Sequence, residues 1–445
     1  MTVRWMKRAG SAAIVAALSV AGTGAVSPAC AGEFNVIDYG AVCDDPLQDS
    51  TPSFQAALNA AASVNGGTVW VPRCRFWFDG SLAMGNGVAL AGQGIGPYDP
   101  YWYPSAFTQG PTLMPRASTA SGPAFISING TSSAVQNLLF YYPEQAGPLD
   151  AVPDVYPPTL LVRGTSKITG CLFVNSYIAI HVMVGRVFLE KLHIGGLKND
   201  IIVDTAPDLV RISQVTMSIF WDFGLAPPQA LDYWVLQNGT GITSYLADSL
   251  SIHDINIHFR NVGIAFRNSP VVYGGTTYGK ASDVDLDSVN YGVVAEALNT
   301  HAGFQFTNLN VGPEIFGGHM IWLKTGGVPP HAPKMVVTGG STRANWQQTL
   351  RVDAGTLIVR DIIGLNPIGH LPALGIRAPT LPTSGVPYVS NLPTDGRVTI
   401  SGGSVSDVLI GGQSTGLTSG MFEVAPGEAI SVIYSSPPTW QWFLK

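Results

Sequence analysis

Residues 252–257 have the sequence Ile-His-Asp-Ile-Asn-Ile, in which a polar doublet follows one apolar residue and two further apolar residues alternate with a polar one. Related units recur along the chain at 135–140, 168–173, 189–194, 212–217, 286–291 and 306–311, and more loosely at 337–339 and 359–362. The shortest spacings between units are 20 to 23 residues. This period predicts a parallel β-helix, in which each rung (one full turn of the chain) consists of short strands joined by bends.

The repeated pattern also predicts which side chains face the interior. A single rung cannot bury its own apolar face, so the rungs must stack and share one core. Because side chains alternate along a strand, Ile252, Ile255 and Ile257 are expected to point inward, while the polar doublets face solvent at the bends. Longer gaps between units, such as 218–247, predict insertions at the turns, and such insertions commonly form the binding surface of a solenoid.

The N-terminal region predicts a strand, a helix and a second strand. Residues 34–41 form a strand-like stretch, and Asp49 and Ser50 then provide a cap for a helix. An apolar stripe at helical spacing follows at Phe54, Ala57, Leu58 and Ala61. The glycines at 66–67 are expected to stop this helix, and 68–72 begin the next strand.

The run VIDYGAVCDD…DSTPSFQAALNAA…GGTVWVP…LAGQG, within 34–96, resembles the start of the pectate-lyase-superfamily β-helix proteins. That group includes rhamnogalacturonase-like hydrolases, exo-glucanases and viral tailspike depolymerases. The resemblance implies an all-β, right-handed parallel β-helix with an N-terminal capping helix, action on a polysaccharide, and a homotrimer as in many tailspike-like proteins. Cys43 and Asp45 replace the family's usual Gly-Asp-Gly run, and Cys74 stands near its usual Pro-Gly. A disulfide between Cys43 and Cys74 would account for both departures.

The first 31 residues are predicted to be an export signal. Arg4, Lys7 and Arg8 precede an apolar run over 9–26, and the residues at 29–31 are small, as a cleavage site requires. The mature protein would then begin near residue 32 and be secreted or periplasmic. A membrane anchor, and a lipid attached to the cysteine within 29–31, are the alternatives.

The remaining chain divides into two expected domains. The β-helix is predicted to cover 32–385. The Gly- and Ser-rich tail 386–445 is predicted to be a small β cap that closes the last rung or joins subunits, because an uncovered solenoid end would be an aggregation edge. No later stretch could span a bilayer. Cys171 falls on an inward strand position and is expected to be a small buried side chain.

Composition excludes several classes of protein. The chain has 51 Gly, 32 Pro and only 12% charged residues, which favours β-structure with many turns over coiled coils or disorder. The formal net charge is −6, and no basic cluster is present. Nucleic acid is therefore not expected as a partner, because phosphate binding needs concentrated Lys and Arg.

The longest insertion, 218–247, holds the first candidate residues. It contains Trp221 and Asp222, then Tyr233 and Trp234. Sugars pack their flat C–H faces on aromatic rings, and an acid between aromatic residues keeps its proton more readily, so Asp222 is a candidate acid and the aromatic residues are candidate substrate platforms. The alternative is a carboxylate that caps a turn beside an ordinary aromatic cluster.

A second set of candidates lies on neighbouring predicted rungs. Asp285 and Asp287 alternate with apolar residues, as does Asp283, and are expected to point outward in a row. His253 and Asp254 occupy the bend one unit earlier, and we expect His253 to lie beside Asp287. A hydrolase could use these groups as its acid and base, and a lyase could bind calcium there. The alternative is a solvated strand face.

Four further residues are weaker candidates. Glu190 belongs to the same outward column, although a surface ion pair is the alternative. Tyr141 and Glu144 leave a strand together and could form a sugar subsite or simply a turn. Glu314, followed by His319 and Trp322, is a similar case. Gly318-His319-Met320 is not the Gly-His-Gly motif of polygalacturonase-like hydrolases, and the accompanying motifs of that group are absent from the sequence.

Together these features predict a secreted glycoside hydrolase that acts on a polysaccharide or oligosaccharide. Asp222, Asp254, Asp287 and Glu190 are the candidate catalytic groups. A polysaccharide lyase that cleaves a uronate-containing glycan is the first alternative, and a non-catalytic glycan-binding protein is the second. No metal site and no cofactor are expected, apart from calcium if the protein is a lyase.

Overall fold

The computed structural model describes residues 32–93, 110–116, 122–145, 152–219, 229–313, 318–324, 333–342, 350–363, 379–392 and 395–444. Trp221, Asp222 and Glu314, three of the predicted site residues, lie outside these ranges, as does the predicted export signal.

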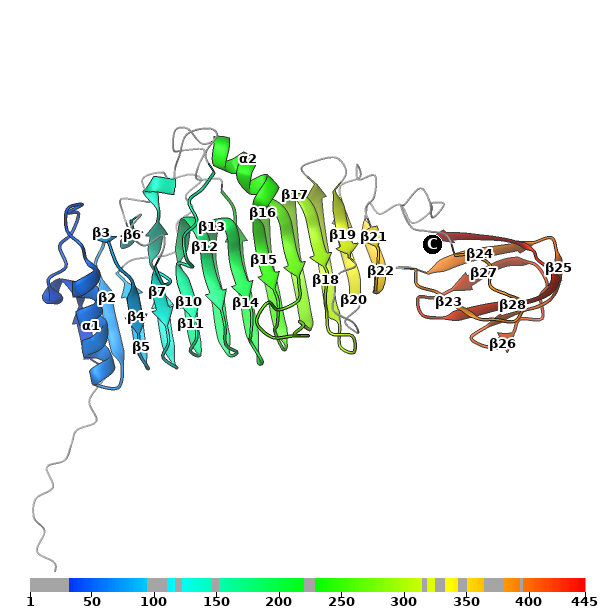
Figure 1. Ribbon diagram of the computed structural model, residues 1–445, viewed down its shortest axis with the longest axis horizontal. Helices are drawn as coiled ribbons and strands as arrows, with labels where there is room; N and C mark the ends of the chain where they lie inside the picture. Colours follow the sequence, from blue (N-terminus) through cyan, green and yellow to red (C-terminus); the bar gives the residue numbers. More distant parts are fainter. Residues whose placement is uncertain are drawn as a thin grey trace, which may run out of the picture. The chain divides into compact units, whose positions relative to one another are not determined.

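Strands β1 to β22 of the described chain form one continuous system of 22 parallel strands. Each rung turns through three faces, and on every face the strands of successive rungs lie side by side (Figure 1). In some rungs the strand runs on through the bends, so that β16 (Leu250–Phe266) and β17 (Gly279–Ala295) pass through all three faces. The predicted parallel β-helix is therefore confirmed.

The three faces share strands where a rung is continuous. Face 1 contains β1 (Gly32–Asn35), β2 (Gly67–Val71), β5 (Val88–Gly92), β8 (Ser133–Gln136), β11 (Ser166–Thr169) and the starts of β13 (Val187–Val203), β14 (Val210–Met217), β16, β17, β18 (Phe304–Pro313), β20 (Lys334–Thr342) and β22 (Thr356–Ile363). Face 2 contains β3 (Arg75–Phe78), β6 (Thr112–Pro115), β9 (Leu139–Tyr141), the start of β12 (Leu172–Val182) and the next segments of the longer strands. Face 3 contains β4 (Leu82–Met84), β7 (Ile126–Ile128), β10 (Leu160–Val162), β15 (Thr240–Ser244), β19 (His319–Leu323), β21 (Leu350–Val352) and the ends of β12, β13, β16 and β17.

The apolar positions of the repeat fill a single interior, as predicted. Ile252, Ile255 and Ile257 are 2% exposed or less, and they belong to one cluster that runs from the first rung to the last. Cys171 is a free, fully buried cysteine in the same cluster. Burial of this core over many stacked rungs supplies the main stabilisation of the solenoid.

The bend between face 1 and face 2 is a single residue in the left-handed conformation, repeated in rung after rung. Asp254, Asp283 and Asn308 have φ angles of 55°, 54° and 57°, and the strand register places them in one column. Asn, Asp and Gly adopt this conformation more readily than other residues, because a short polar side chain can hydrogen-bond locally. The two aspartates therefore have a conformational reason to stand at this bend.

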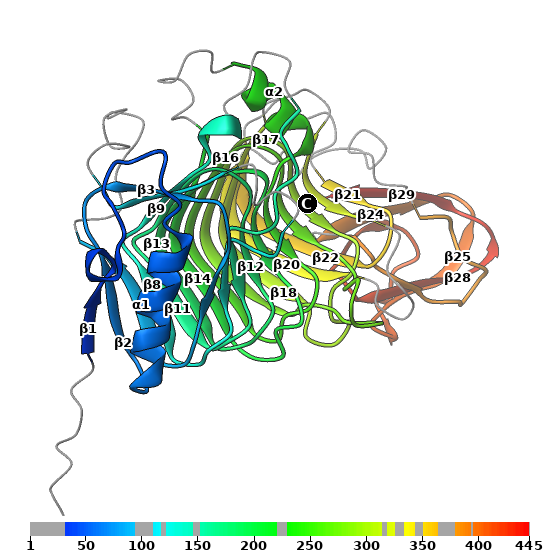
Figure 2. The same cartoon turned by 60° about the vertical axis from the view of Figure 1, so that its left-hand side comes forward.

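Helix α1 (Thr51–Ser63) packs beside the first rungs (Figure 2). Its buried face carries the predicted apolar stripe, which includes Phe54 and Leu58. The cap differs in detail from the prediction, because the Ser50 side chain makes no capping bond. The Asp49 Oδ1 atom instead accepts hydrogen bonds from the backbone N–H groups of Thr51, at 2.9 Å, and Asp79, at 3.0 Å.

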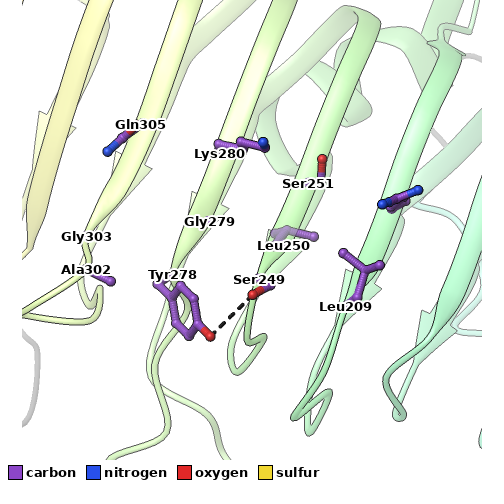
Figure 3. Close-up of a pocket in the computed structure, with 11 residues that line it drawn as sticks. Leu209, Ser249, Leu250, Ser251, Tyr278, Gly279, Lys280, Ala302, Gly303 and Gln305 are labelled. Atoms are coloured by element: carbon purple, nitrogen blue, oxygen red, sulfur yellow. Dashed lines mark hydrogen bonds between the residues drawn. The ribbon is translucent and has the colours of Figure 1, made fainter.

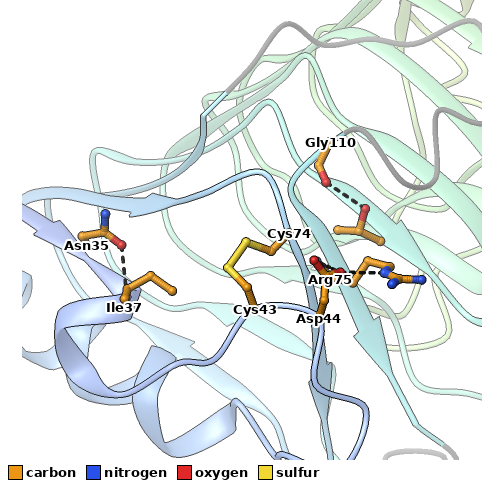
Figure 4. The surroundings of a disulfide bond; sticks show 8 residues. Asn35, Ile37, Cys43, Asp44, Cys74, Arg75 and Gly110 are labelled. Carbon is orange, nitrogen blue, oxygen red and sulfur yellow. Dashed lines mark hydrogen bonds and ion pairs between the residues drawn. A yellow bond between two sulfur atoms is a disulfide. The ribbon is translucent and has the colours of Figure 1, made fainter.

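The predicted disulfide joins Cys43 and Cys74, whose Cα atoms are 5.2 Å apart (Figure 4). Beside it, the Arg75 Nε atom lies 2.7 Å from the Asp44 Oδ1 atom. Both links tie the segment before α1 to the start of face 2, so the N-terminal end of the solenoid is held covalently as well as by packing.

Two insertions of the described chain form short helices at the corner between face 2 and face 3. The 3-10 helix η4 (Pro143–Gln145) follows β9, and α2 (Gln229–Asn238) lies between β14 and β15. Helix α2 packs against the ends of β13 and β16. Neither α1, α2 nor any other helix in the described ranges is long and apolar enough to cross a lipid bilayer.

The C-terminal region forms two antiparallel sheets with their own core. One sheet has the order β23 (Tyr388–Val389), β28 (Ala429–Ser436), β25 (Ser404–Ile410), β26 (Gln413–Ser414), and the other has the order β27 (Gly420–Val424), β24 (Gly396–Ser401), β29 (Thr439–Leu444). Trp442, which is 1% exposed, and Leu392, which is fully buried, belong to this core. That the region closes the last rung or joins subunits stays a prediction.

The predicted register of β17 is wrong by five residues. His253 lies beside Ser282, not beside Asp287, and Asp287 lies beside His258. The unit equivalent to 252–257 is therefore 281–286. Leu286 and Val289 have the same three-residue spacing as Ala281 and Val284, so the sequence pattern alone does not distinguish the two registers.

Candidate active site

Face 3 differs from face 1 in the environment of its outward side chains. On face 1, Lys167, Arg211 and Lys280 point outward and are exposed. On face 3, Thr243 and Ala265 alternate with core residues and so point outward, yet they are 2% and 0% exposed. Face 3 is thus covered at these rungs, whereas outward residues on other rungs, such as Ala83, are exposed.

His181 is the most notable polar group of face 3. It lies on β12 between two core residues and therefore points outward. Burial lowers the pKa of His181 below its ordinary value of 6.5; the charge of Asp204 opposes this effect and that of Arg163 adds to it. Its Nε2 atom is buried and has no hydrogen-bond partner among the described residues. A neutral histidine with an unused ring nitrogen can accept a proton at neutral pH.

Asp204 stands at the corner where face 3 turns into face 1. Its backbone N–H donates to the Val182 carbonyl oxygen at 2.9 Å, which places it one rung after His181 and at the same corner. The carboxylate is 2% exposed and its Oδ1 atom accepts from the Ser269 hydroxyl at 2.8 Å and from the Thr205 N–H at 2.8 Å. Two donors on one oxygen hold the negative charge in a fixed place near His181.

Basic residues accompany this pair. Arg163 follows β10 and Arg267 follows β16, each at the same corner position as Asp204. The Arg267 Nε atom is buried without a partner in the described chain. Burial lowers the pKa of Lys198, and the charge of Arg267 lowers it further. Positive charge thus acts on His181 from Arg163 and on Lys198 from Arg267, an arrangement along face 3 that suits an anionic ligand.

Helix α2 supplies an aromatic residue to the same region. The Trp234 ring lies 6.4 Å from that of Tyr177, and the Lys198 Nζ atom is 5.8 Å from the Trp234 ring centroid. Lys198 also donates to the Asn238 carbonyl oxygen at 2.9 Å, so the end of α2 is fastened to face 3. Two rings and a cation provide both a flat apolar surface and a charge, the two features by which proteins bind sugars and their acidic groups.

A buried ion pair fixes the corner beneath α2. Arg260 and Asp200 are both fully buried and bond through two hydrogen bonds, at 2.8 and 2.9 Å. The Asp200 Oδ1 atom also accepts from the Gly196 N–H at 2.7 Å. Burial raises the pKa of Asp200, and Arg260 opposes that rise. The pair ties β13 to β16 two residues away from Lys198.

A second aromatic cluster lies further along face 3. Tyr291, His319 and Trp322 have ring centroids 5.4 to 5.9 Å apart. The Arg351 guanidinium carbon is 4.4 Å from the Trp322 ring centroid, and the Trp322 Nε1 atom donates to Asp353 at 2.8 Å. His319 and Trp322, noted in the sequence beside Glu314, thus belong to face 3.

The candidates predicted around β16 and β17 lie away from this cluster. His253 points outward on face 1, where its Nδ1 atom is 2.8 Å from the Ser282 hydroxyl oxygen and 3.5 Å from the Asp283 carboxylate. Asp254 and Asp283 stand at the bend, and Asp285 lies on face 2.

Asp287 is also on face 2, with its carboxylate 3.7 Å from the His258 Nδ1 atom. The predicted group of His253 and the aspartates is therefore divided between face 1 and face 2. In the described ranges it brings no group of three His, Cys, Asp or Glu side chains close enough to hold a metal ion.

The remaining predicted residues have separate surroundings. Glu190 forms an ion pair with Lys167 at 2.7 Å on face 1. Tyr141 packs against a small apolar cluster, and Glu144 in η4 accepts from the Tyr156 hydroxyl at 3.1 Å. Tyr233 is 64% exposed on α2. Trp234, also predicted, lies against Tyr177 and Lys198 at the start of face 3.

Sequence reasoning missed His181, Asp204 and Lys198. One signal was available, because His181 is a lone ionisable residue in the apolar run 178–182. The orientation of that side chain could not be read from the pattern, since the pairing of β12 with β13 shifts register between Val174 and Ile178.

Comparison with known proteins agrees with this architecture. Residues 33–157 match the family described as rhamnogalacturonase A/epimerase, pectate lyase-like. A tailspike protein of the E. coli bacteriophage HK620, solved with a pentasaccharide, superposes with a TM-score of 0.50 at 10% identity and 92% coverage of both chains. An exopolygalacturonase from Thermotoga maritima gives a TM-score of 0.41 at 11% identity, covering 75% of this chain and 92% of its own.

Curated relatives match a shorter segment. Mannuronan C5-epimerase AlgE1 of Azotobacter vinelandii is 41% identical over 70 residues, which is 14% of this chain and 5% of the epimerase. AlgE4 of the same organism is 39% identical over 71 residues, or 14% of this chain and 13% of its own. The chain therefore spans only a small part of these relatives. Residues 33–157 thus carry the pattern of the rhamnogalacturonase A/epimerase, pectate lyase-like family, on a chain that folds as a right-handed parallel β-helix.

Proposed function

We propose that the protein is a polysaccharide-active enzyme whose reaction takes place on face 3, with His181 as the group that accepts a proton from the sugar. The observation that carries this proposal is the place of His181 on face 3, where its Nε2 atom is buried without a hydrogen-bond partner among the described residues and the charge of the fixed Asp204 carboxylate acts on the ring. Ionisable groups with perturbed pKa values in a covered site are functional candidates.

The charges around His181 favour β-elimination on a uronate-containing glycan. In that reaction the base removes the proton from C5, the electron pair of the C5–H bond forms the C4–C5 double bond, and the C4–O glycosidic bond breaks, with the departing oxygen keeping that bond's electron pair and taking a proton from water. The uronate carboxylate carries extra negative charge on the way. Arg163 supplies positive charge to His181, and Arg267 and Lys198 supply it elsewhere along face 3, where these charges would stabilise that state. We therefore rank elimination above hydrolysis, whereas the sequence alone favours hydrolysis.

The names of the relatives support the same class of chemistry. The matched family is named rhamnogalacturonase A/epimerase, pectate lyase-like, and the curated relatives are named mannuronan C5-epimerases, so epimerase and lyase appear among these names beside rhamnogalacturonase. Because the relatives match only a short segment, the proposal depends mainly on His181.

Glycoside hydrolysis is the second candidate. Asp254 and Asp283 occupy the same bend position on neighbouring rungs, about 4.8 Å apart in the backbone, and hydrolases need two carboxyl groups flanking one bond. Against this, both residues lie at a position that favours aspartate for conformational reasons.

We further propose that the protein works outside the cytoplasm. The Cys43–Cys74 disulfide is of the kind that persists in oxidising compartments, and a polysaccharide substrate would be met there.

A panel of plant and bacterial polysaccharides tests these proposals. Elimination yields products that absorb in the ultraviolet and whose masses sum to that of the substrate, whereas hydrolysis adds one water per cut. We expect ultraviolet-absorbing products from the wild type, and none from His181→Gln. Asp254→Asn serves as the matched variant at the bend. Products that gain water and vanish in Asp254→Asn would support the hydrolase, and glycan binding without any product would support a binding protein.

A further inference from the structure

Face 1 contains a hollow of about 500 Å³ that the reaction proposed for face 3 does not use (Figure 3). It lies where β14, β16, β17 and β18 begin. Arg211, Ser251, Lys280 and Gln305 line it from one outward column, since the strand register pairs each of them with the next. Four neighbouring rungs therefore present one polar side chain each to the same hollow.

The charge of the hollow is positive. Arg211 and Lys280 both line it and both are exposed, and no acidic side chain is among its lining residues. Within the described ranges neither cation forms an ion pair; Arg211 instead lies over the Phe188 ring at 5.7 Å. Asp208, which precedes the lining residue Leu209, pairs with Arg186 at 2.7 Å. Two cations without a carboxylate between them form a site for an anion.

The rest of the hollow suits a sugar ring better than a bare ion. Leu209 and Tyr278 contribute apolar surface, and the Ser249 hydroxyl donates to the Tyr278 hydroxyl at 3.3 Å. Ser251 and Gln305 add hydrogen-bonding groups beside the two cations. Apolar surface with a few polar groups around it is the usual composition of a small-molecule site.

The spacing of the cations also fits a chain of acidic sugars. Arg211 and Lys280 are two rungs apart, which corresponds to about 9.6 Å along the solenoid. An anionic polymer that runs parallel to the solenoid axis could place a charged group at each cation.

We propose that this hollow is a second glycan-binding site, separate from face 3, that holds a carboxylate-bearing segment of a polysaccharide. The proposal rests on the proposed function in that it takes a polysaccharide as the ligand, but it does not depend on His181 or on the type of reaction. Such a site would keep a polymer attached to the protein while another segment occupies face 3.

The test measures binding directly, by calorimetry at low ionic strength, with the full chain carrying His181→Gln so that nothing is consumed. The probes are a hexasaccharide of a uronic acid, a neutral hexose hexasaccharide of the same length, and inorganic phosphate. We expect the acidic hexasaccharide to bind and the affinity to fall with added salt. Equal binding of the neutral hexasaccharide, or phosphate binding as tight as that of the acidic sugar, would overturn the proposal.

Variants assign the binding to the hollow. Arg211→Gln with Lys280→Gln should weaken binding of the acidic hexasaccharide about tenfold or more, since two charge-assisted contacts are lost. Ser251→Trp should also weaken it by filling the space between the cations without changing the charge. Lys167→Gln is the control, because Lys167 lies on the same outward column outside the hollow and is paired with Glu190. Unchanged binding in both hollow variants would overturn the site.

The two proposals fail separately. If face 3 is not the active site, His181→Gln keeps its activity while the hollow variants still lose binding. If the hollow binds nothing, the hollow variants bind like the control while His181→Gln remains inactive.

Discussion

Arg260 holds Asp200 with both side chains completely buried, the Nε atom 2.8 Å from Oδ2 and the Nη2 atom 2.9 Å from Oδ1. Arg260 also donates to the carbonyl oxygens of His258 and Phe259, so its guanidinium joins Asp200 on β13 to the bend within β16. Because Lys198 lies two residues before Asp200 and is fastened to α2, the pair connects the solenoid backbone to the candidate active site.

Removal of one partner of this pair should be costly. Arg260→Met leaves Asp200 charged and buried, and we expect a loss of about 3–5 kcal/mol in the free energy of unfolding. The double variant Arg260→Met with Asp200→Leu should recover much of that loss, because no buried charge remains. Denaturant unfolding of both variants checks this, and a double variant no more stable than the single one would contradict it.

The activity of the enzyme should rise with pH across the titration of His181. Burial lowers the pKa of His181 below 6.5, so the ring is uncharged and able to accept a proton over the whole neutral range. The acidic limb of the kcat/KM profile should therefore lie below pH 6.5, the ordinary histidine value. An acidic limb above that value would show that another group is titrating.

The same histidine should make stability depend on pH. The unfolded chain binds a proton at His181 more readily than the folded chain, so acidification favours unfolding as the pH falls below 6.5, down to the folded-state pKa. His181→Gln should remove this contribution while leaving stability at pH 8 nearly unchanged. Thermal unfolding of wild type and variant at several pH values measures the difference, and identical pH dependence in the two proteins would disprove the assignment.

The Cys43–Cys74 disulfide should stabilise the N-terminal end of the solenoid. The two cysteines are 31 residues apart in the sequence, for which chain-entropy arguments give about 3–4 kcal/mol. Cys43→Ser with Cys74→Ser should lower the unfolding free energy by about that amount and increase hydrogen exchange first in α1 and β2. Exchange that increases uniformly over the rungs would speak against a local effect.

The acids at the bend between face 1 and face 2 should be replaceable. Asp254→Asn keeps a residue that adopts the left-handed conformation, so stability should change by less than about 0.5 kcal/mol and activity should be retained. Asp254→Val should destabilise by about 1–2 kcal/mol, since a β-branched residue is strained at a φ of 55°. Equal stability of the two variants would show that the conformation does not select the residue.

The sequence was sufficient to predict the rungs, the core and α1, because stacked rungs require an apolar residue at each inward position. The candidate site is less readily predicted from the sequence. Asp254 and Asp283 stand out as acids, yet their bend position favours aspartate whatever the function.

The sequence pattern does not mark His181 as a candidate, because its strand lacks the polar doublet of the repeat. The outward direction of its side chain also depends on a shift in the pairing of β12 with β13. The prediction of the β17 register was wrong for a related reason. Apolar residues have the same spacing around two different bends of that strand. Local pattern identifies a rung, whereas the face on which a side chain lies depends on pairing with the next rung.

The most direct measurement compares turnover of one uronate-containing polysaccharide by wild type, His181→Gln and Asp254→Asn, each shown to be folded by circular dichroism. We predict that Asp254→Asn keeps nearly full turnover while His181→Gln loses about a hundredfold or more, as expected for a lost general base. Full turnover in His181→Gln together with a collapse in Asp254→Asn would move the reaction off face 3 and contradict the account.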